Sequence, residues 1–205
     1  MKRFSKSLLM IAAMFCLMAF ASVQSAKADI VVFNTTGAFS NGTNTITFGT
    51  GANTTTLTFM GSTANRVDTP SFSNFGDIIT NSTGTGAAVS GGFTLTFTVT
   101  SPVTGSDTAN GTLSGSLRSD SSTATLFFTD PTASVGGFTF TVIQTAIGVI
   151  LVPQTTGAGG NANPGTTTIQ GNVTGSAIPE PATMILLGTG LAGVVAKVRR
   201  RRKAE

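Results

Sequence analysis

One stretch of strict alternation limits what this chain can fold into. Residues 92–100 read Gly-Phe-Thr-Leu-Thr-Phe-Thr-Val-Thr, so an extended strand would carry four threonines on one face and four apolar side chains on the other. A helix would scatter these residues around its surface, because its period is about 3.6 residues rather than two. The stretch therefore predicts a β-strand with one buried and one exposed face.

Shorter versions of this pattern recur along the chain, separated by turn signals such as Asn41-Gly42, Asn110-Gly111 and Asp130-Pro131. The other candidate strands are residues 30–33, 45–48, 56–59, 77–80, 111–117, 124–129, 138–142, 147–152 and 166–173. About ten short strands, each with one apolar face, predict an all-β fold, namely an antiparallel β-sandwich of jelly-roll type.

The composition leaves one alternative open. Residues 29–178 contain 35 Thr and 22 Gly, and Gly, Ser and Thr with little charge also suit a flexible linker. Because the alternation favours a packed domain, we assign residues 29–154 to the β-sandwich. Residues 155–178, where Gly, Asn and Thr dominate, are predicted to be a spacer. The predicted aromatic core consists of Phe33, Phe48, Phe59, Phe93, Phe97, Phe127, Phe128, Phe138 and Phe140.

The charges are distributed unevenly along the chain. Lys and Arg number 12 and Asp and Glu number 8, which gives a net charge of +4. Residues 1–28 carry four cations, and residues 179–205 carry six cations against two Glu, so each end is +4. Residues 29–178 hold two Arg and six Asp and are therefore −4. Since a nucleic-acid-binding domain places its basic residues on the folded part, we expect no nucleic-acid partner.

Residues 29–178 also lack the side chains of most catalytic sites, because they contain no His, Lys, Glu, Tyr, Trp or Cys. A Ser-His-Asp triad, a Cys-His pair and a Cys/His zinc site are thereby excluded from this segment. We expect no enzyme, and we predict no catalytic, cofactor-binding or metal-binding residue. Two alternatives use aspartates: a Ca²⁺ site in the loops, and a glycosidase with paired carboxylates. A turn role is favoured for those that stand beside Thr, Ser or Pro, namely Asp68, Asp107, Asp120 and Asp130.

Residues 1–28 have the layout of a secretory signal peptide. Three cations precede an apolar run over residues 8–21, and Ala26-Lys27-Ala28 matches the A-x-A site of signal peptidase. We predict a signal helix that signal peptidase removes between Ala28 and Asp29. An uncleaved anchor is the alternative, but the apolar run is shorter than the roughly 20 residues of a spanning helix.

Residues 179–205 form a second hydrophobic end. Pro179, Glu180 and Pro181 precede fifteen uncharged residues, 182–196, and a basic cluster that contains Arg199, Arg200, Arg201 and Arg202. A helix over residues 182–196 would cover about 22 Å. This is short for a hydrocarbon core of about 30 Å, but Lys197 can snorkel to the interface. We therefore predict a transmembrane helix whose basic end stays cytoplasmic, which leaves the β domain outside. A plain C-terminal anchor is the alternative.

This order of elements resembles the PEP-CTERM sorting signal, which is typical of exported proteins in Gram-negative bacteria that make extracellular polysaccharide. The resemblance rests on Pro179, Glu180 and Pro181, on the apolar helix, and on the basic cluster from Arg199 to Arg202. It implies that an exosortase, a membrane-embedded cysteine transpeptidase or protease, recognises the tail in the inner membrane and removes it near Pro-Glu-Pro. Residues 57–80 more faintly resemble "choice-of-anchor" extracellular domains, which have no assigned activity.

The favoured function is therefore a non-catalytic, biofilm-associated protein of the envelope or extracellular matrix. It would first be a precursor anchored in the inner membrane and would then be released to the envelope or the exterior. The alternative is a surface module that binds exopolysaccharide or a divalent cation. We rank it second because the chain has no Trp or Tyr on which a sugar could stack.

Overall fold

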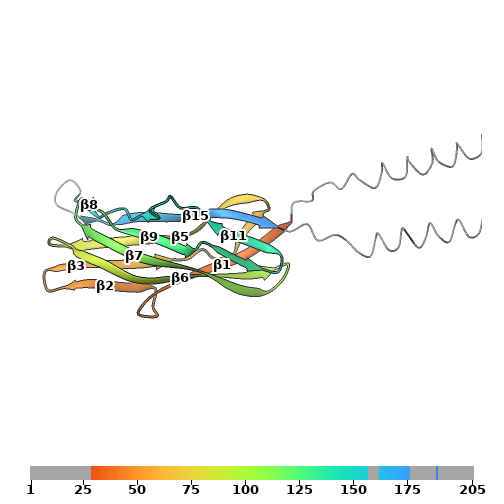
Figure 1. Ribbon diagram of the computed structural model, residues 1–205, viewed down its shortest axis with the longest axis horizontal. Helices are drawn as coiled ribbons and strands as arrows, with labels where there is room; N and C mark the ends of the chain where they lie inside the picture. Colours follow the sequence, from red (N-terminus) through yellow and green to blue (C-terminus); the bar gives the residue numbers. More distant parts are fainter. Residues whose placement is uncertain (1–28, 157–161, 176–187, 189–205) are drawn as a thin grey trace, which may run out of the picture.

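The chain folds into β-strands (Figure 1). The computed structural model describes residues 29–156, 162–175 and 188. Every pair among the named strands is antiparallel, which confirms the predicted all-β antiparallel fold. The strands are β1 Ile30–Phe39, β2 Thr45–Thr50, β3 Asn53–Met60, β4 Asn65–Asp68, β5 Ser71–Thr83, β6 Ala87–Ser101, β7 Gly105–Arg118, β8 Ser121–Ser122, β9 Thr125–Asp130, β10 Thr132–Val135, β11 Phe138–Val142, β12 Val149–Ile150, β13 Thr155–Thr156, β14 Ala162–Asn163 and β15 Gly165–Gly175.

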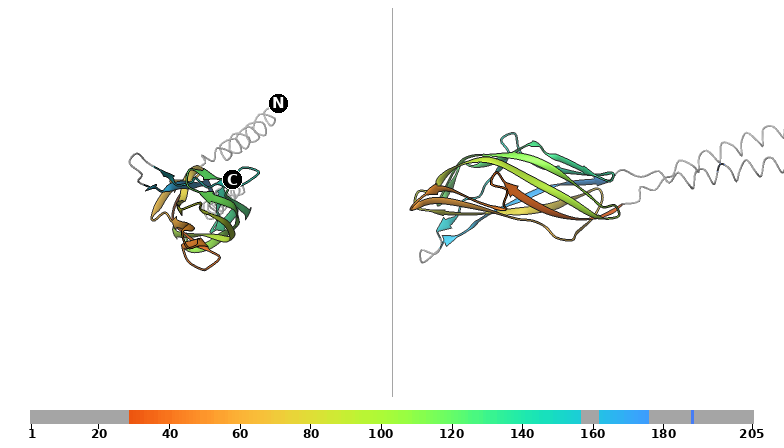
Figure 2. Two further views of the ribbon diagram at one scale, coloured as in Figure 1. Left: turned by 90° about the vertical axis from the view of Figure 1, so that its left-hand side faces the viewer. Right: turned by 90° about the horizontal axis from the view of Figure 1, so that it is seen from below.

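The strands form two large, curved antiparallel sheets whose buried faces enclose a common core (Figure 2). One sheet has seven strands in the order β12-β9-β7-β6-β1-β4, with β8 beside β7. The other has six strands in the order β10-β11-β15-β5-β3-β2. A separate ribbon of β13 and β14 lies outside both sheets. The jelly-roll connectivity remains a prediction.

The alternating stretches identify the central strands correctly but underestimate their length. The predicted strand at residues 92–100 is part of β6, and residues 77–80 are part of β5. Both strands continue through segments rich in Ser, Thr, Asn and Gly, where buried apolar residues such as Phe75 and Val89 are too sparse to give a regular alternation. At residues 147–152 the predicted strand is instead too long, since only Val149–Ile150 forms a strand.

The candidate strand at residues 166–173 is confirmed, whereas the spacer assigned to residues 155–178 does not hold for residues 165–175. These residues form β15, which lies inside the six-stranded sheet between β11 and β5. Its inward positions alternate small and apolar residues: Gly165, Thr167, Ile169, Gly171 and Val173 are all buried. The glycines of this segment suggested flexibility. At Gly171, however, glycine is needed because the ring of Phe75 and the carbonyl of Thr141 leave no room for a side chain.

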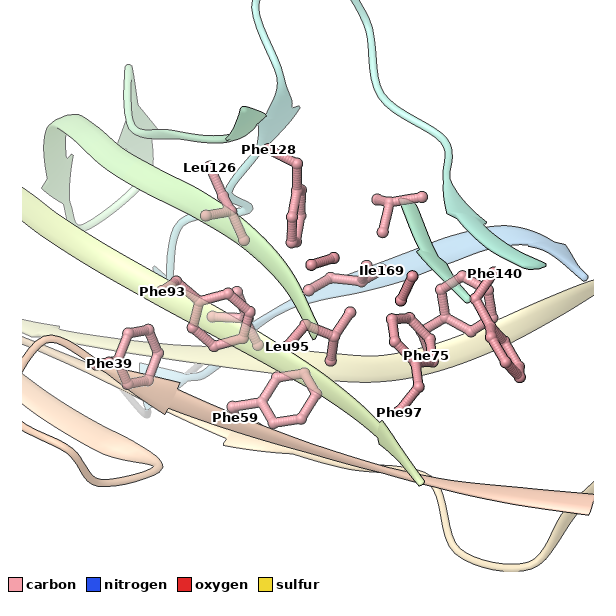
Figure 3. Packing of buried hydrophobic residues seen from close by; sticks show 14 of the residues in the cluster. Phe39, Phe59, Phe75, Phe93, Leu95, Phe97, Leu126, Phe128, Phe140 and Ile169 are labelled. Atoms are coloured by element: carbon pink, nitrogen blue, oxygen red, sulfur yellow. The ribbon is translucent and has the colours of Figure 1, made fainter. Parts of the chain in front are cut away.

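The core between the sheets contains two clusters of phenylalanine rings among Val, Leu, Ile and Ala side chains (Figure 3). In one cluster the ring of Phe97 lies 4.8 Å from the ring of Phe75 and 4.8 Å from that of Phe140. In a second cluster the ring of Phe93 lies 5.1 Å from Phe39 and 5.3 Å from Phe59. Phe97 and Phe93 belong to the seven-stranded sheet. Their partners Phe75, Phe140 and Phe59 belong to the six-stranded sheet, so each cluster joins the two sheets.

Two of the nine predicted core phenylalanines are not fully buried, and two core members were missed. Phe127 is 38% exposed, because it is adjacent to the buried Phe128 on β9 and adjacent strand residues point to opposite faces. Phe48 is only partly buried on the edge strand β2. The missed residues are Phe39 and Phe75, which lie where β1 and β5 extend beyond the predicted strands.

The predicted signal helix (1–28) and all of the predicted transmembrane helix (182–196) except Gly188 lie outside the described residues. Both helices remain predictions. Among residues 29–156, 162–175 and 188, no helix is long and apolar enough to cross a membrane.

Candidate functional site

Both ends of the described domain meet at Thr69. The backbone N–H and the hydroxyl of Thr69 donate to the carbonyl of Asp29, at 3.0 and 2.9 Å. At the other end of the chain, a Cβ added to Gly175 would lie 2.7 Å from the Thr69 hydroxyl. The residue that follows the predicted signal-peptidase site and the last residue of β15 therefore lie at one pole of the domain (Figure 1).

The sequence-predicted sorting and cleavage residues lie outside the described residues. They are Ala26, Ala28, Pro179, Glu180, Pro181, Arg199, Arg200, Arg201 and Arg202. The structure describes the strands that lead up to them, β1 and β15, and shows that these strands belong to opposite sheets.

Four of the six aspartates hold the fold together through hydrogen bonds. Asp130 accepts from the N–H and hydroxyl of Thr132, at 3.4 and 3.1 Å, as a turn aspartate does. Asp120, in a turn with a φ of 65°, accepts from the N–H of Thr156 at 2.9 Å. Asp107 accepts from the N–H of Ser134 at 2.7 Å, and Asp77 accepts from the Thr168 hydroxyl at 2.6 Å.

The turn prediction is wrong for Asp107, which lies within β7, whereas Asp68 and Asp130 are the last residues of β4 and β9. Asp107 instead bridges the two sheets, because its partner Ser134 belongs to β10. Among the described residues, no three His, Cys, Asp or Glu side chains are grouped so that they could hold a metal ion.

At the sheet edge formed by β9 and β12, two backbone positions are bonded to side chains of the same domain. The amide of Gln144 pairs with both backbone groups of Phe128 in β9, accepting its N–H at 2.8 Å and donating to its carbonyl at 2.7 Å. Beyond β12, Thr167 accepts the N–H of Val152 at 2.7 Å, and Thr80 donates to its carbonyl at 2.6 Å. Such contacts oppose strand addition by another chain at this edge.

Hydroxyl groups cover the outer face of the six-stranded sheet. Thr47 in β2 and Thr56 in β3 are hydrogen-bonded at 2.9 Å, and Thr54 in β3 and Thr83 in β5 at 2.8 Å. The face is thus mainly polar over these three strands, with Asp77 as its charged residue and Met60 as an exposed apolar one. Uncharged hydroxyls can donate and accept hydrogen bonds, but without an adjacent base they are weak nucleophiles.

A groove runs along β4 and β5, close to the pole where the chain ends meet. It has a volume of about 380 Å³ and is lined by Asn65, Arg66, Val67, Asp68, Ser71, Phe72, Ser73 and Asn74. The exposed residues alternate along each strand: Arg66 and Asp68 on β4, and Phe72 and Asn74 on β5. Asn65 ties the two strands together, since its amide donates to the Ser73 hydroxyl at 2.7 Å and to the Asn74 carbonyl at 3.1 Å.

The groove was missed in the sequence, although one signal pointed to it. Phe72 and Phe75 are an odd number of positions apart, so they cannot lie on the same face of a regular strand. Phe75 is fully buried, whereas Phe72 is 74% exposed. The spacing thus indicated that one of these rings faces solvent.

Comparison with known proteins identifies the tail. Residues 177–202 match the model of the PEP-CTERM protein-sorting motif, which implies an exported protein that an exosortase processes at the cell envelope. No curated protein and no solved structure matches the chain. The resemblance of residues 57–80 to choice-of-anchor domains stays a prediction.

Proposed function

We propose that this exosortase substrate is a non-catalytic, biofilm-associated component of the cell envelope or extracellular matrix. The observation that carries the proposal is the PEP-CTERM motif at residues 177–202. The motif targets the chain to the envelope. The β domain that precedes the motif in the sequence is the part that would act there.

The proposed route begins with signal peptidase, which cleaves after Ala28. Residues 182–196 then hold the precursor in the inner membrane until the exosortase removes the tail. The position of Asp29 beside Thr69, close to Gly175, supports this route, because both hydrophobic ends would leave the domain at the same pole. The domain could therefore stay folded outside the membrane while either end is being processed.

Two observations support a role without catalysis. Residues 29–178 contain no His, Lys, Glu, Tyr, Trp or Cys, so they lack the usual general acids, bases and nucleophiles other than Asp and hydroxyls. Of the aspartates, Asp77, Asp107, Asp120 and Asp130 are bound to Thr or Ser residues in positions that stabilise the fold.

The sorting step can be tested by replacing Glu180 and Pro181 with Gln and Ala. We expect the variant to accumulate as an uncleaved precursor in the membrane fraction, because the exosortase would no longer recognise its motif. Immunoblotting of membrane and medium fractions measures this. Glu205→Gln is the matched control, since Glu205 is the only other glutamate of the chain. Normal processing of the Glu180/Pro181 variant would indicate that the tail is only a membrane anchor and not a sorting signal.

The first cleavage can be tested at the other end. Mass spectrometry of the exported protein is expected to find Asp29 as the N-terminal residue. Replacing Ala28 with Leu should block this cleavage, because the −1 position of an A-x-A site needs a small residue. Exported protein that still began at Met1 would contradict the assignment of residues 1–28 as a signal peptide.

The alternative function is binding of a polysaccharide or of a divalent cation. The groove between β4 and β5 favours the polysaccharide, because it combines an exposed aromatic ring with several hydrogen-bonding side chains.

A further inference from the structure

The groove along β4 and β5 brings together the two kinds of group that hold a sugar ring. A pyranose has an apolar C–H face, which packs on an aromatic ring, and a rim of hydroxyls, which need donors and acceptors. Phe72 supplies the aromatic ring, and it is 74% exposed. Asp68 and Asn74 supply acceptors, and Arg66 supplies several N–H donors in a plane.

Exposure alone does not distinguish Phe72, because single exposed apolar residues are common on protein surfaces. Met60 and Ile147, for example, are 58% and 61% exposed. Phe72 differs from them because it lies in a hollow of about 380 Å³ with an arginine, an aspartate and two asparagines. This volume is within the range of about 300 to 1,000 Å³ that is usual for ligand sites.

The floor of the groove is held in place before any ligand arrives. Asn65 on β4 donates to Ser73 and to the carbonyl of Asn74 on β5. The hydroxyl of Ser62 donates to the same carbonyl at 3.2 Å. The strands that carry Arg66 and Phe72 are thus joined by side chains, and a preorganised site loses less conformational freedom on binding.

The charges favour an uncharged ligand. Arg66 and Asp68 together contribute no net charge to the groove, and residues 29–178 carry two Arg against six Asp. An anionic polymer would be repelled by the domain as a whole. A neutral sugar would accept from Arg66 and donate to Asp68, and hydrogen bonds to charged groups are stronger than those between neutral groups.

We propose that the groove formed by Arg66, Asp68, Phe72 and Asn74 binds a neutral polysaccharide. This inference rests on the proposed function in one respect, because only an exported domain meets such a polymer. With one aromatic ring, the site is expected to hold a short segment of the polymer weakly.

The test is electrophoresis of the exported protein in native gels that contain dextran, galactomannan or alginate. We expect at least one of the two neutral polymers to retard the protein and the anionic alginate not to do so. Phe72→Ala should weaken the retardation at least tenfold, measured as the polymer concentration that halves the mobility. Phe127→Ala is the matched control and should behave as the original protein, because Phe127 is also exposed but lies outside the groove. Circular dichroism checks that both variants are folded.

Each outcome decides between the possibilities. Retardation that Phe72→Ala leaves unchanged, retardation by alginate alone, or no retardation by either neutral polymer overturns the proposal. Release of reducing ends from a polymer that binds would instead refute the non-catalytic role and leave the groove in place. Sorting is measured separately with the Glu180/Pro181 variant. The sorting proposal and the binding proposal can therefore fail independently of each other.

Discussion

Replacing Phe97 with Ala is expected to lower the free energy of unfolding by about 3 to 5 kcal/mol. Phe97 has no exposed surface and lies on β6 between the buried residues Leu95 and Val99 of the same face. Its ring stacks on Phe140 at 4.8 Å and meets Phe75 edge-on at 4.8 Å, so its removal leaves a cavity between the two sheets. Domains of this size are typically stable by about 5 to 15 kcal/mol, so the loss would be a large share of that free energy.

The measurement is urea unfolding followed by circular dichroism, with Thr96→Val as the matched control. Thr96 is the neighbour of Phe97 on β6, but it lies on the outer face and is only half-buried. Val keeps the shape and the strand preference of Thr, so we expect a change within about 0.5 kcal/mol. Equal losses at the two positions would contradict a sheet that buries one face only.

Gly171→Ala is expected to destabilise the domain by about 1 to 3 kcal/mol or more. Gly171 is buried in β15, and the new methyl group would collide with the ring of Phe75 and the carbonyl of Thr141. The carbonyl belongs to the neighbouring strand β11, so relief would require the strands to separate. In a flexible spacer the same substitution would have almost no effect.

Gln170→Ala provides the control for this prediction, because Gln170 precedes Gly171 on β15 but is exposed. Its replacement should leave the midpoint of urea unfolding nearly unchanged. If Gly171→Ala were equally harmless, residues 165–175 would not be an interior strand, and the original assignment of residues 155–178 to a spacer would be restored.

Periodicity predicted the strands that bury one apolar face, including a candidate strand at residues 166–173, but composition misled where small residues face the core. β11 was predicted with its observed bounds, Phe138–Val142, because Phe138, Phe140 and Val142 alternate with Thr. In β15 the inward positions include Gly165, Thr167 and Gly171, which look like linker residues when their neighbours in space are unknown. Glycine marks a close approach of chains as well as flexibility, and composition does not separate the two.

The sorting signal could be read from the sequence because its parts are contiguous. The groove could not, because its shape depends on how two strands of different sheets come together. β4 pairs with β1 in the seven-stranded sheet, whereas β5 pairs with β15 and β3 in the six-stranded sheet. The short residue spacing between Arg66 and Phe72 gives no indication that both line one hollow.

The meeting of Asp29 and Gly175 at Thr69 has a further consequence for how such a domain can be used. A chain that enters and leaves a domain at one point does not have to span it, so the domain can be inserted into the loop of another protein as a cassette. For the same reason, a short link between residues 29 and 175 would allow new termini to be opened in a turn elsewhere, as in circular permutation. The order of the strands along the chain is thus less constrained than their order in the sheets.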